Sequence, residues 1–572
     1  MTMKTYPKDD LSIVLSAEAG QGLQTLEQLM TRVFKLSGCH VYSYSEFMSR
    51  IRGGNNSTQI RISSRTISSC PRRIDIFVPL HAGAMERFQD RITPETIILG
   101  DPAFIDRRYA EGGYPIVAVP IAGFAREAGG EVYMSVILLG LFSGLLGVEL
   151  TLLEDLVRTF FSRAGEERTR RNIEAARKGY ASGIHLLKPG QVFPVIERSE
   201  AVKKDLLLNG IDAIGMGSLA GGCTFVSSYP MSPSTGVLVF FAKHASEFGI
   251  VVEQAEDEIS AANMALGSWY AGGRAMVTTS GGGYALMVEA MSLAGCIESP
   301  LVVHVGQRPG PATGLPTRTE QADLEHVLYS GHGEFPRLVL APGTIEEGFS
   351  LSRHAFHMAD RYQVPVILLT DQHYLESTCT VRQLDVPASS ESFVVETDAA
   401  YRRYRFTESG VSPRGIPGFG RGLVCVDSDE HGEAGFITED SRTRTAMVEK
   451  RLQKLRGLEE ECREPTLTGG EGYRNLVVGW GSTAGVVREA LLVLGRKDLS
   501  FLHFSQVYPL HPKAATLIGR AQKKIVIENN ATSQFARLVR MHTGIAFDAS
   551  ILKFDGWPFL LEEVVERLEA LL

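Results

Sequence analysis

A repeated order of short β-branched runs, glycine-bearing turns and amphipathic helices limits the fold of this chain more than any other feature. The first instance is the apolar run at residues 11–16, which AEAGQGLQTLEQLMTRVFKLSG follows as a turn and a helix that ends at Gly38. Strands that alternate with helices in this way favour a parallel or mixed sheet with helices packed against it. The sequence therefore predicts the α/β class.

The same order recurs along the chain, so we expect three doubly wound α/β domains. A length of 572 residues agrees with this number, because domains usually contain roughly 100–200 residues. The first domain is expected at residues 1–190, the second at 191–385 and the third at 471–572. Residues 386–470 have few long apolar runs and are interpreted as a connector. Strands of the second domain are expected at 224–227, 250–253, 275–278, 301–305 and 364–369.

Composition disfavours several classes of protein. The net charge of −8 argues against general binding to nucleic acid. No apolar run reaches the roughly 18–20 residues that cross a bilayer, and residues 133–148 are expected to form a buried helix instead. The N-terminal MTMKTYPKDD has no apolar signal core, so we expect a cytoplasmic protein without a membrane segment. The seven cysteines form no Cys-x-x-Cys pair, so we expect neither a metal site nor an iron–sulfur cluster held by this chain alone.

Two glycines stand between the first strand and the first helix. In the order Gly20-Gln21-Gly22 they let a backbone approach a phosphate at a helix N-terminus, where free N–H groups and a partial positive charge favour anions. The third glycine of the full dinucleotide fingerprint is absent, so a simple tight turn is an equally good reading. Arg52, in the later segment RIRGGNN, adds a cation that suits a polyanionic ligand.

Polar residues follow the first two expected strands of the middle domain. The loop YPMSPSTG, which contains Tyr229, Pro230 and Ser232, has two prolines and three hydroxyls that could bind a carboxylate or carbonyl group, although a plain turn remains open. Glu258 opens the next helix, where a carboxylate can simply compensate the helix dipole. That helix continues as the uncharged ISAANMALG and should be buried, so Glu258 needs a partner.

Two further loops follow strands of the same expected sheet. Ser280 and Gly281 lie in TTSGGG, and Arg308 and Thr317 lie in HVGQRPGPATGLPT. Open α/β sheets bind ligands at the carboxyl ends of their strands, which is where both loops begin. An arginine among glycines and prolines can act as a fork for an anion or can form an ordinary surface ion pair.

Taken in chain order, YPMSPSTG, EDEISAANMALG, TTSGGG and HVGQRPGPATGLPTRTEQADL resemble the alpha subunit of 2-oxoacid:ferredoxin oxidoreductases. The N-terminal region with GQG and RGG resembles the gamma domain of that family, here fused ahead of alpha. The residues from Asn475 onward resemble its transketolase-C-terminal-like domain. The long form and the segment QRPGPATGLPT are most similar to enzymes that act on 2-oxoglutarate.

The resemblance implies a middle domain of the thiamine-diphosphate pyrimidine type and a role for each residue singled out above. These roles are Glu258 as the catalytic residue that contacts the aminopyrimidine; Ser232, Arg308 and Thr317 for the substrate; Tyr229, Pro230, Ser280 and Gly281 for the cofactor; and Gly20, Gly22 and Arg52 for coenzyme A. Ser232 stands where many members have threonine, and Gly236 where an acidic residue is common. These two departures leave the identity of the 2-oxoacid open.

The resemblance also implies partners. No Gly-Asp-Gly, the start of the Mg²⁺–diphosphate motif, occurs in the sequence. In the family a beta subunit carries this motif and a 4Fe-4S cluster, so a dimer of alpha–beta heterodimers that reduces ferredoxin is expected. The implied reaction is the reversible, coenzyme A-dependent oxidative decarboxylation of 2-oxoglutarate to succinyl-CoA and CO₂. The alternatives are the same chemistry on pyruvate or another 2-oxoacid, or a non-catalytic nucleotide-binding regulatory protein that uses the GQG turn.

Overall fold

The computed structural model describes residues 9–48, 53–186, 196–386 and 391–572. These residues divide into two compact units. The first unit comprises the described residues up to Leu208 together with Glu376–Gln383 and Leu560–Val564. The second comprises the other described residues from Asn209 onward. The boundaries expected at residues 190, 385 and 470 stay predictions.

A mixed sheet with the strand order β6-β5-β4-β1-β3-β2-β14-β7 forms the centre of the first unit. Its strands are β1 (Asp10–Ala19), β2 (His40–Glu46), β3 (Gly53–Ser63), β4 (Ile76–Pro79), β5 (Ile97–Gly100), β6 (Ile116–Ala118), β7 (Leu206–Asn209) and β14 (Ser377–Val381). Strand β1 runs parallel to β4 and antiparallel to β3, and Leu11, Ile13 and Leu15 on it are buried. The prediction of a parallel or mixed sheet in this region is confirmed.

Helices cover this sheet, and one of them is entirely buried. The helices are α1 (Leu23–Leu36), α2 (Ala84–Arg87), α3 (Arg107–Glu111), α4 (Ile121–Ala128), α5 (Met134–Leu145), α6 (Leu150–Phe161) and α7 (Glu166–Leu186). Every residue of α5 is buried, which confirms the buried helix expected at residues 133–148. Helix α5 lies directly on α7, because a Cβ at Gly140 or Gly179 would overlap a carbonyl oxygen of the facing helix.

The described part of the chain contains no single helix that is long and apolar enough to cross a bilayer. Helix α4 and residues 131–145 pass a test of length and composition together, but they are bent by 114°.

A sheet with the order β18-β12-β13-β11-β10-β8-β9 forms the centre of the second unit. Its strands are β8 (Phe225–Ser228), β9 (Val251–Gln254), β10 (Ala275–Thr279), β11 (Leu301–Gln307), β12 (Leu338–Leu340), β13 (Pro365–Asp371) and β18 (Gln506–Tyr508). All pairs are parallel except that of β12 with β18. Strands β10, β11 and β13 are buried along their whole length, as expected for parallel strands covered on both faces. The five strands predicted here are confirmed.

A five-stranded sheet with the order β15-β17-β16-β19-β20 lies later in the same unit. Its strands are β15 (Thr466–Thr468), β16 (Asn475–Trp480), β17 (Leu499–Phe504), β19 (Lys523–Glu528) and β20 (Ala549–Leu552). Helices of the second unit are α8 (Gly210–Ala220), α9 (Thr235–Phe248), α10 (Glu258–Tyr270), α11 (Gly281–Leu286), α12 (Val288–Cys296), α13 (Leu324–Tyr329), α14 (Ile345–Tyr362), α15 (Gln372–Glu376), α16 (Ser441–Glu460), α17 (Thr483–Leu494), α18 (Lys513–Gly519), α19 (Gln534–Thr543) and α20 (Leu561–Leu571). The last residue of α15 and the first four of α20 are assigned to the first unit. The α/β class is confirmed.

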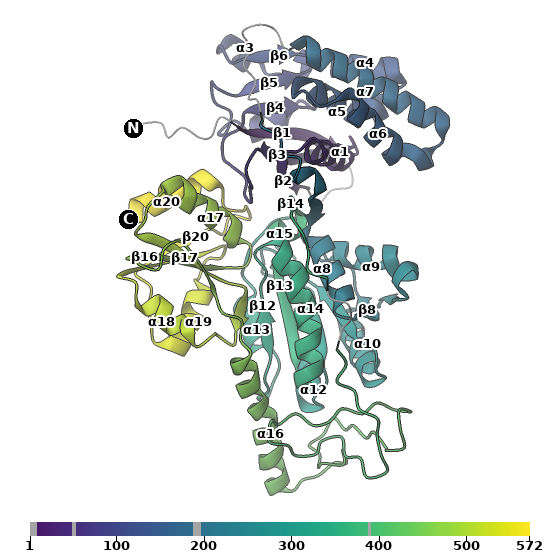
Figure 1. Cartoon of the computed structure of the whole chain (residues 1–572), viewed down its shortest axis with the longest axis vertical. Coiled ribbons are helices and arrows are strands. Elements are labelled where there is room, and N and C mark those ends of the chain that lie inside the picture. Colours follow the sequence, from purple (N-terminus) through teal and green to yellow (C-terminus); the bar gives the residue numbers. More distant parts are fainter. Residues whose placement is uncertain (1–8, 49–52, 187–195, 387–390) are drawn as a thin grey trace. The chain divides into compact units, whose positions relative to one another are not determined.

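A cluster of ion pairs at Glu298 joins helix α16 to the rest of the second unit. Helix α16 follows a segment of irregular loops (Figure 1). Lys450 and Lys454 on α16 place their ammonium nitrogens 2.6 and 2.5 Å from the Glu298 carboxylate, and all three side chains are buried. Burial alone would raise the pKa of Glu298, but Lys454 and Lys450 hold it well below its usual range. Removing one partner from such a cluster leaves a buried charge without compensation.

We therefore expect Glu298→Gln to lower the free energy of unfolding by about 3–5 kcal/mol. Glu464→Gln is the matched control, because it removes the same charge from an exposed pair with Lys513 and should have a much smaller effect on stability. Calorimetric unfolding of the two variants measures the difference. Equal shifts in melting temperature would show that the cluster at Glu298 is no more important than a surface ion pair.

Candidate functional site

Three loops meet at the carboxyl ends of β8, β10 and β11 in the second unit. A Cβ added to Gly282 would lie 3.9 Å from Met231 Sδ and 4.0 Å from the carbonyl oxygen of Ala312, so all three loops touch there. Gly306 allows a similar approach, because its Cβ would lie 3.1 Å from Pro233 Cγ. The sheet thus gathers the loops that follow Ser228, Thr279 and Gln307, as the order of strands predicts.

Glu258 lies at the first position of α10 and points its carboxyl group into the interior. Asp257 caps the helix by accepting a hydrogen bond of 2.7 Å from the Ser260 N–H. The Glu258 residue is only 3% exposed, and its Oε1 has no hydrogen-bond partner among the described residues. Burial raises the pKa of this carboxyl group. Because Asp257 already provides the cap, capping does not account for Glu258.

The glycine-rich loop after β10 leaves the space that Glu258 occupies. A Cβ at Gly283 would overlap Thr279 Oγ1 and would lie 2.5 Å from Glu258 Oε1. In the same loop the Ser280 hydroxyl is fully buried and also lacks a hydrogen-bond partner. Buried polar groups are almost always paired, and leaving one unpaired costs about 1–3 kcal/mol. These two unpaired groups therefore indicate a ligand that offers its own donors and acceptors.

Arg308 faces the loop that contains Ser232. Its guanidinium donates a hydrogen bond of 2.6 Å to the carbonyl oxygen of Ser232, which links the two residues that the sequence assigned to one site. The charge of Arg308 acts on the nearby Asp323 carboxyl group and lowers its pKa, but burial is the larger effect and raises this pKa to about 6. The Gly281 backbone lies directly against the Asp323 carboxylate, so a Cβ would overlap it. One arginine therefore stands beside one acid whose charge is weakened by burial.

Asp323 was missed by the sequence analysis. It precedes α13, where an acidic residue is most simply read as a helix cap. The only signal was its place at the end of the segment that carries Arg308 and Thr317. The contact with Gly281 depends on tertiary packing, and no local pattern reveals it.

His304 lies within a segment that the sequence analysis quoted, but it belongs to the core. Its two ring nitrogens lie 2.7 Å from Thr278 Oγ1 and 2.8 Å from Thr370 Oγ1. Burial lowers its pKa to about 3, so the ring is neutral. His304 therefore ties together β10, β11 and β13 and leaves its nitrogens no role at the site.

The other residues assigned to this site lie at its margin. Tyr229 is 42% exposed and Pro230 is partly buried at the start of their loop. Thr317 begins a segment that packs against residues 556–557, where the Arg318 guanidinium lies 4.2 Å from the Trp557 ring centre. Among the described residues, no hydrogen bond joins the Thr317 side chain to Arg308. The assignments of these three residues stay predictions.

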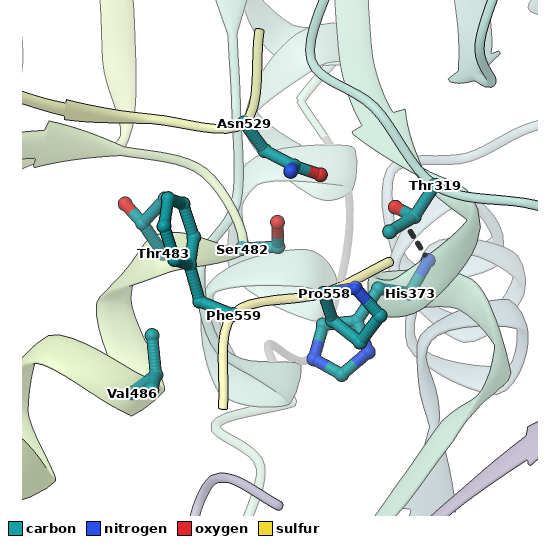
Figure 2. Close-up of a pocket in the computed structure, with 8 residues that line it drawn as sticks. All are labelled: Thr319, His373, Ser482, Thr483, Val486, Asn529, Pro558 and Phe559. Atoms are coloured by element: carbon teal, nitrogen blue, oxygen red, sulfur yellow. Dashed lines mark hydrogen bonds between the residues drawn. The ribbon is translucent and has the colours of Figure 1, made fainter. Parts of the chain in front are cut away.

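Figure 2 shows the small pocket beyond this segment. Its lining residues are Thr319, His373, Ser482, Thr483, Val486, Asn529, Pro558 and Phe559. Thr319 accepts a hydrogen bond of 3.1 Å from the backbone N–H of His373, which is the dashed line in the figure. The cavity has about 10 Å³, which is about the space of one water molecule. The residues around this cavity therefore hold the segment at Thr319 in place, and the cavity is too small for a substrate.

In the first unit, Gly20 and Gly22 form the turn between β1 and α1. Both have positive φ angles, 95° and 75°, which favour glycine. A Cβ at Gly22 would lie 2.6 Å from Ser135 Oγ, which donates to the Gly22 carbonyl oxygen, whereas the space around Gly20 is open. The turn leads directly into the N-terminus of α1, a geometry that suits a phosphate. Arg52, assigned to the same site, lies outside the described residues.

Comparisons with known proteins agree along most of the chain. The family described as "Pyruvate flavodoxin/ferredoxin oxidoreductase, thiamine diP-bdg" matches residues 216–450, and "Pyruvate ferredoxin/flavodoxin oxidoreductase" matches residues 12–182. A 2-oxoacid:ferredoxin oxidoreductase subunit alpha from a Sulfolobus species is 30% identical over 98% of this chain and 96% of its own length. The 2-oxoglutarate oxidoreductase subunit KorA of Mycobacterium tuberculosis is 28% identical over 99% of this chain and 92% of its own length.

A solved structure matches nearly the whole chain. It is 2-oxoglutarate:ferredoxin oxidoreductase from Magnetococcus marinus, with 2-oxoglutarate, coenzyme A and succinyl-CoA bound. It is 31% identical with a TM-score of 0.91, and the match covers 99% of this chain and 100% of that chain. The family resemblance drawn from the loop sequences is therefore confirmed.

The space at Gly283 yields a test of the site's geometry. Gly283→Ala should lower the free energy of unfolding by about 1–3 kcal/mol, because the new methyl group displaces Glu258 or Thr279. Gly267→Ala is the control, since its Cβ would meet no atom within 4 Å and alanine is the better helix former by up to about 1 kcal/mol. Thermal unfolding compares the two. A Gly283→Ala protein as stable as the control would mean that Glu258 is not held against this loop.

Proposed function

Because this chain belongs to the 2-oxoacid:ferredoxin oxidoreductase family as an alpha subunit, we propose that it takes part in the oxidative decarboxylation of 2-oxoglutarate. The products are succinyl-CoA and CO₂, the reaction is reversible, and ferredoxin accepts the electrons. The observation that carries the proposal is the pair of unpaired buried groups, Glu258 Oε1 and Ser280 Oγ, at the loop edge of the sheet. Pyruvate or another 2-oxoacid remains the alternative substrate.

The residues at this edge fit the aminopyrimidine end of thiamine diphosphate. A pyrimidine ring with an amino group offers donors and acceptors in one plane. Among the described residues, Glu258 Oε1 and Ser280 Oγ both lack such partners. Gly281 and Gly283 bring the backbone close to these side chains without filling the space. Tyr229 and Pro230, which begin the adjoining loop, are assigned to the same cofactor.

Glu258 is the residue that would move a proton. When bound, thiamine diphosphate supplies a nucleophilic carbon that attacks the keto group and takes up the electron pair left by decarboxylation. Glu258 holds a proton at its carboxyl group more readily than an exposed glutamate, because burial raises its pKa. A hydrogen bond from this carboxyl group to a ring nitrogen is strong in a buried site. The cap by Asp257 fixes the helix end that orients Glu258.

A second subunit completes the proposed site. The sequence has no Gly-Asp-Gly, so we assign the Mg²⁺–diphosphate side and a 4Fe-4S cluster to a beta subunit in a dimer of alpha–beta heterodimers. Exposed apolar side chains on β9 and on helices α9, α10 and α11 support a partner surface on these elements. They are Val239 and Phe248 on α9, Val251 on β9, Ile259 and Met264 on α10, and Leu286 on α11. Strand β9 is also the last strand of its sheet.

Arg308 is the proposed partner of a substrate carboxylate. Its hydrogen bond to the Ser232 carbonyl oxygen orients the guanidinium and leaves other N–H groups for a ligand. 2-Oxoglutarate carries a second carboxylate that pyruvate lacks, so a fixed cation favours it. Ser232 and Thr317 are assigned to the same substrate. The bound 2-oxoglutarate of the Magnetococcus marinus enzyme supports this choice.

Coenzyme A is assigned to the turn at Gly20 and Gly22. The open space beside Gly20 and the N-terminus of α1 suit the phosphates of this ligand. The coenzyme A in the Magnetococcus marinus structure supports its use as a co-substrate. Arg52 is retained in the proposal as a cation for the same phosphates.

The central test is Glu258→Gln in the complex assembled with its beta subunit. We expect turnover of 2-oxoglutarate, followed with coenzyme A and a low-potential dye, to fall by about 10²–10⁴-fold, because glutamine cannot exchange the proton. The exposed Glu256 provides the matched control, and Glu256→Gln should keep nearly full activity. A crippled Glu256→Gln enzyme beside a nearly normal Glu258→Gln enzyme would contradict the assignment.

Arg308→Lys tests the substrate carboxylate. Lysine keeps the charge but loses the fork, so KM for 2-oxoglutarate should rise by about tenfold or more, with a smaller change for pyruvate. Arg496→Lys, at an exposed arginine paired with Asp498, is the control and should leave both KM values unchanged. An Arg308→Lys enzyme with normal KM for both substrates would remove Arg308 from the site.

A further inference from the structure

A cationic cavity lies at the other edge of the parallel sheet, where the strands begin. It has about 350 Å³ and is lined by Ala220, Gly221, Arg274, Arg353, His354, His357 and Glu391. Arg274 directly precedes β10, and the glycine-rich loop beside Glu258 follows that strand. Five residues of strand separate the two ends by roughly 16 Å, so a ligand in this cavity cannot touch the reacting atoms.

Helix α14 supplies one arginine and two histidines to the wall of the cavity. Arg353, His354 and His357 lie on the face of α14 that lines the cavity, and the two imidazole rings stack with their centres 6.2 Å apart. Gly221 lets the end of α8 approach this helix, because its Cβ would lie 3.2 Å from the Cα of Arg353. The wall is therefore built by close packing of two helices.

Arg274 also lines the cavity, and its guanidinium already donates three hydrogen bonds within the protein. Its guanidinium donates 2.7 Å to the Gly221 carbonyl oxygen and 2.6 Å to Asp360 Oδ2, and it also donates to the carbonyl oxygen of Glu391. Asp360 in turn pairs with Arg414 as well, so this aspartate neutralises neither Arg353 nor the histidines. Arg274 thus holds the shape of the cavity and adds to its positive potential.

Arg353 and His354 keep polar atoms without partners. Arg353 Nε and His354 Nε2 are buried and have no hydrogen-bond partner among the described residues, and Arg353 forms no ion pair with a described carboxylate. Glu391 also lines the cavity, and its carboxylate lies 3.8 Å from His357 Nδ1 and is 65% exposed. Burial, together with the nearby charges of Arg463, His357 and Arg353, lowers the pKa of His354 to about 3, so its ring is neutral.

We propose that this cavity binds a small ligand that carries phosphate or carboxylate groups. A volume of about 350 Å³ falls within the usual range of small-molecule pockets, roughly 300–1,000 Å³. Oxyanions accept hydrogen bonds from Arg353 Nε and from the Nε2–H tautomer of neutral His354, and they offset the positive charge of Arg353. The site is independent of the substrate, cofactor and coenzyme A sites proposed above.

The test is binding of inorganic phosphate and of citrate to the purified complex, compared with chloride at equal ionic strength. We expect one of the two anions to raise the melting temperature along a saturable curve that chloride does not reproduce. A stronger response to phosphate identifies a phosphorylated ligand, and a stronger response to citrate identifies a polycarboxylate. The absence of a saturable response to both anions overturns the proposal.

Variants locate the binding. Arg353→Gln should weaken the anion's affinity by about 10- to 100-fold, because it removes a charge-assisted hydrogen bond. Glu391→Gln removes a carboxylate that lines the cavity and should strengthen binding, which provides a gain that misfolding cannot imitate. Arg496→Gln removes an exposed arginine elsewhere and is the control. Unchanged affinity in both Arg353→Gln and Glu391→Gln would place the anion at another site and overturn the proposal.

Discussion

Parallel strands deliver their following loops to one edge of a sheet, and the second unit depends on this constraint. The loops after β8, β10 and β11 meet there so closely that glycine is required, as Gly283 against Glu258 and Gly281 against Asp323 show. A methyl group at either glycine would push an acidic side chain away. The TTSGGG sequence is therefore needed less for flexibility than for the space that it leaves to two buried carboxyl groups.

The two edges of this sheet differ in charge and in how that charge is compensated. At the loop edge, burial raises the pKa values of Glu258 and Asp323, so their negative charge is weakened. At the opposite edge, Arg274 and Arg414 share the single carboxylate of Asp360, which leaves the neighbouring cavity positive. One strand, β10, connects these environments. Its side chains are buried and none is charged, so the two environments stay separate along this strand.

The sequence predicted the long elements and the loops that follow them, because these leave local signals. Strands β10 and β11 begin with the apolar runs 275–277 and 301–303, and Glu258 was singled out because an uncharged helix follows it. Strands β12 and β18 have three residues each, too few for a periodic pattern, and β18 joins its sheet from a distant part of the chain. His304 stands in the same segment as Arg308 but satisfies both of its ring nitrogens within the core, which the sequence alone does not reveal.

Tertiary contacts also explain why the assignments within one loop have different support. Arg308 lies close to the strand end that positions it, and its hydrogen bond to Ser232 follows from the meeting of two loops at one edge. Thr317 lies further along, where Arg318 stacks on Trp557 and Thr319 binds the carbonyl oxygen of Gly556. The end of the loop is thus fixed by a later part of the chain. Sequence spacing alone could not distinguish the half that faces the site from the half that anchors it.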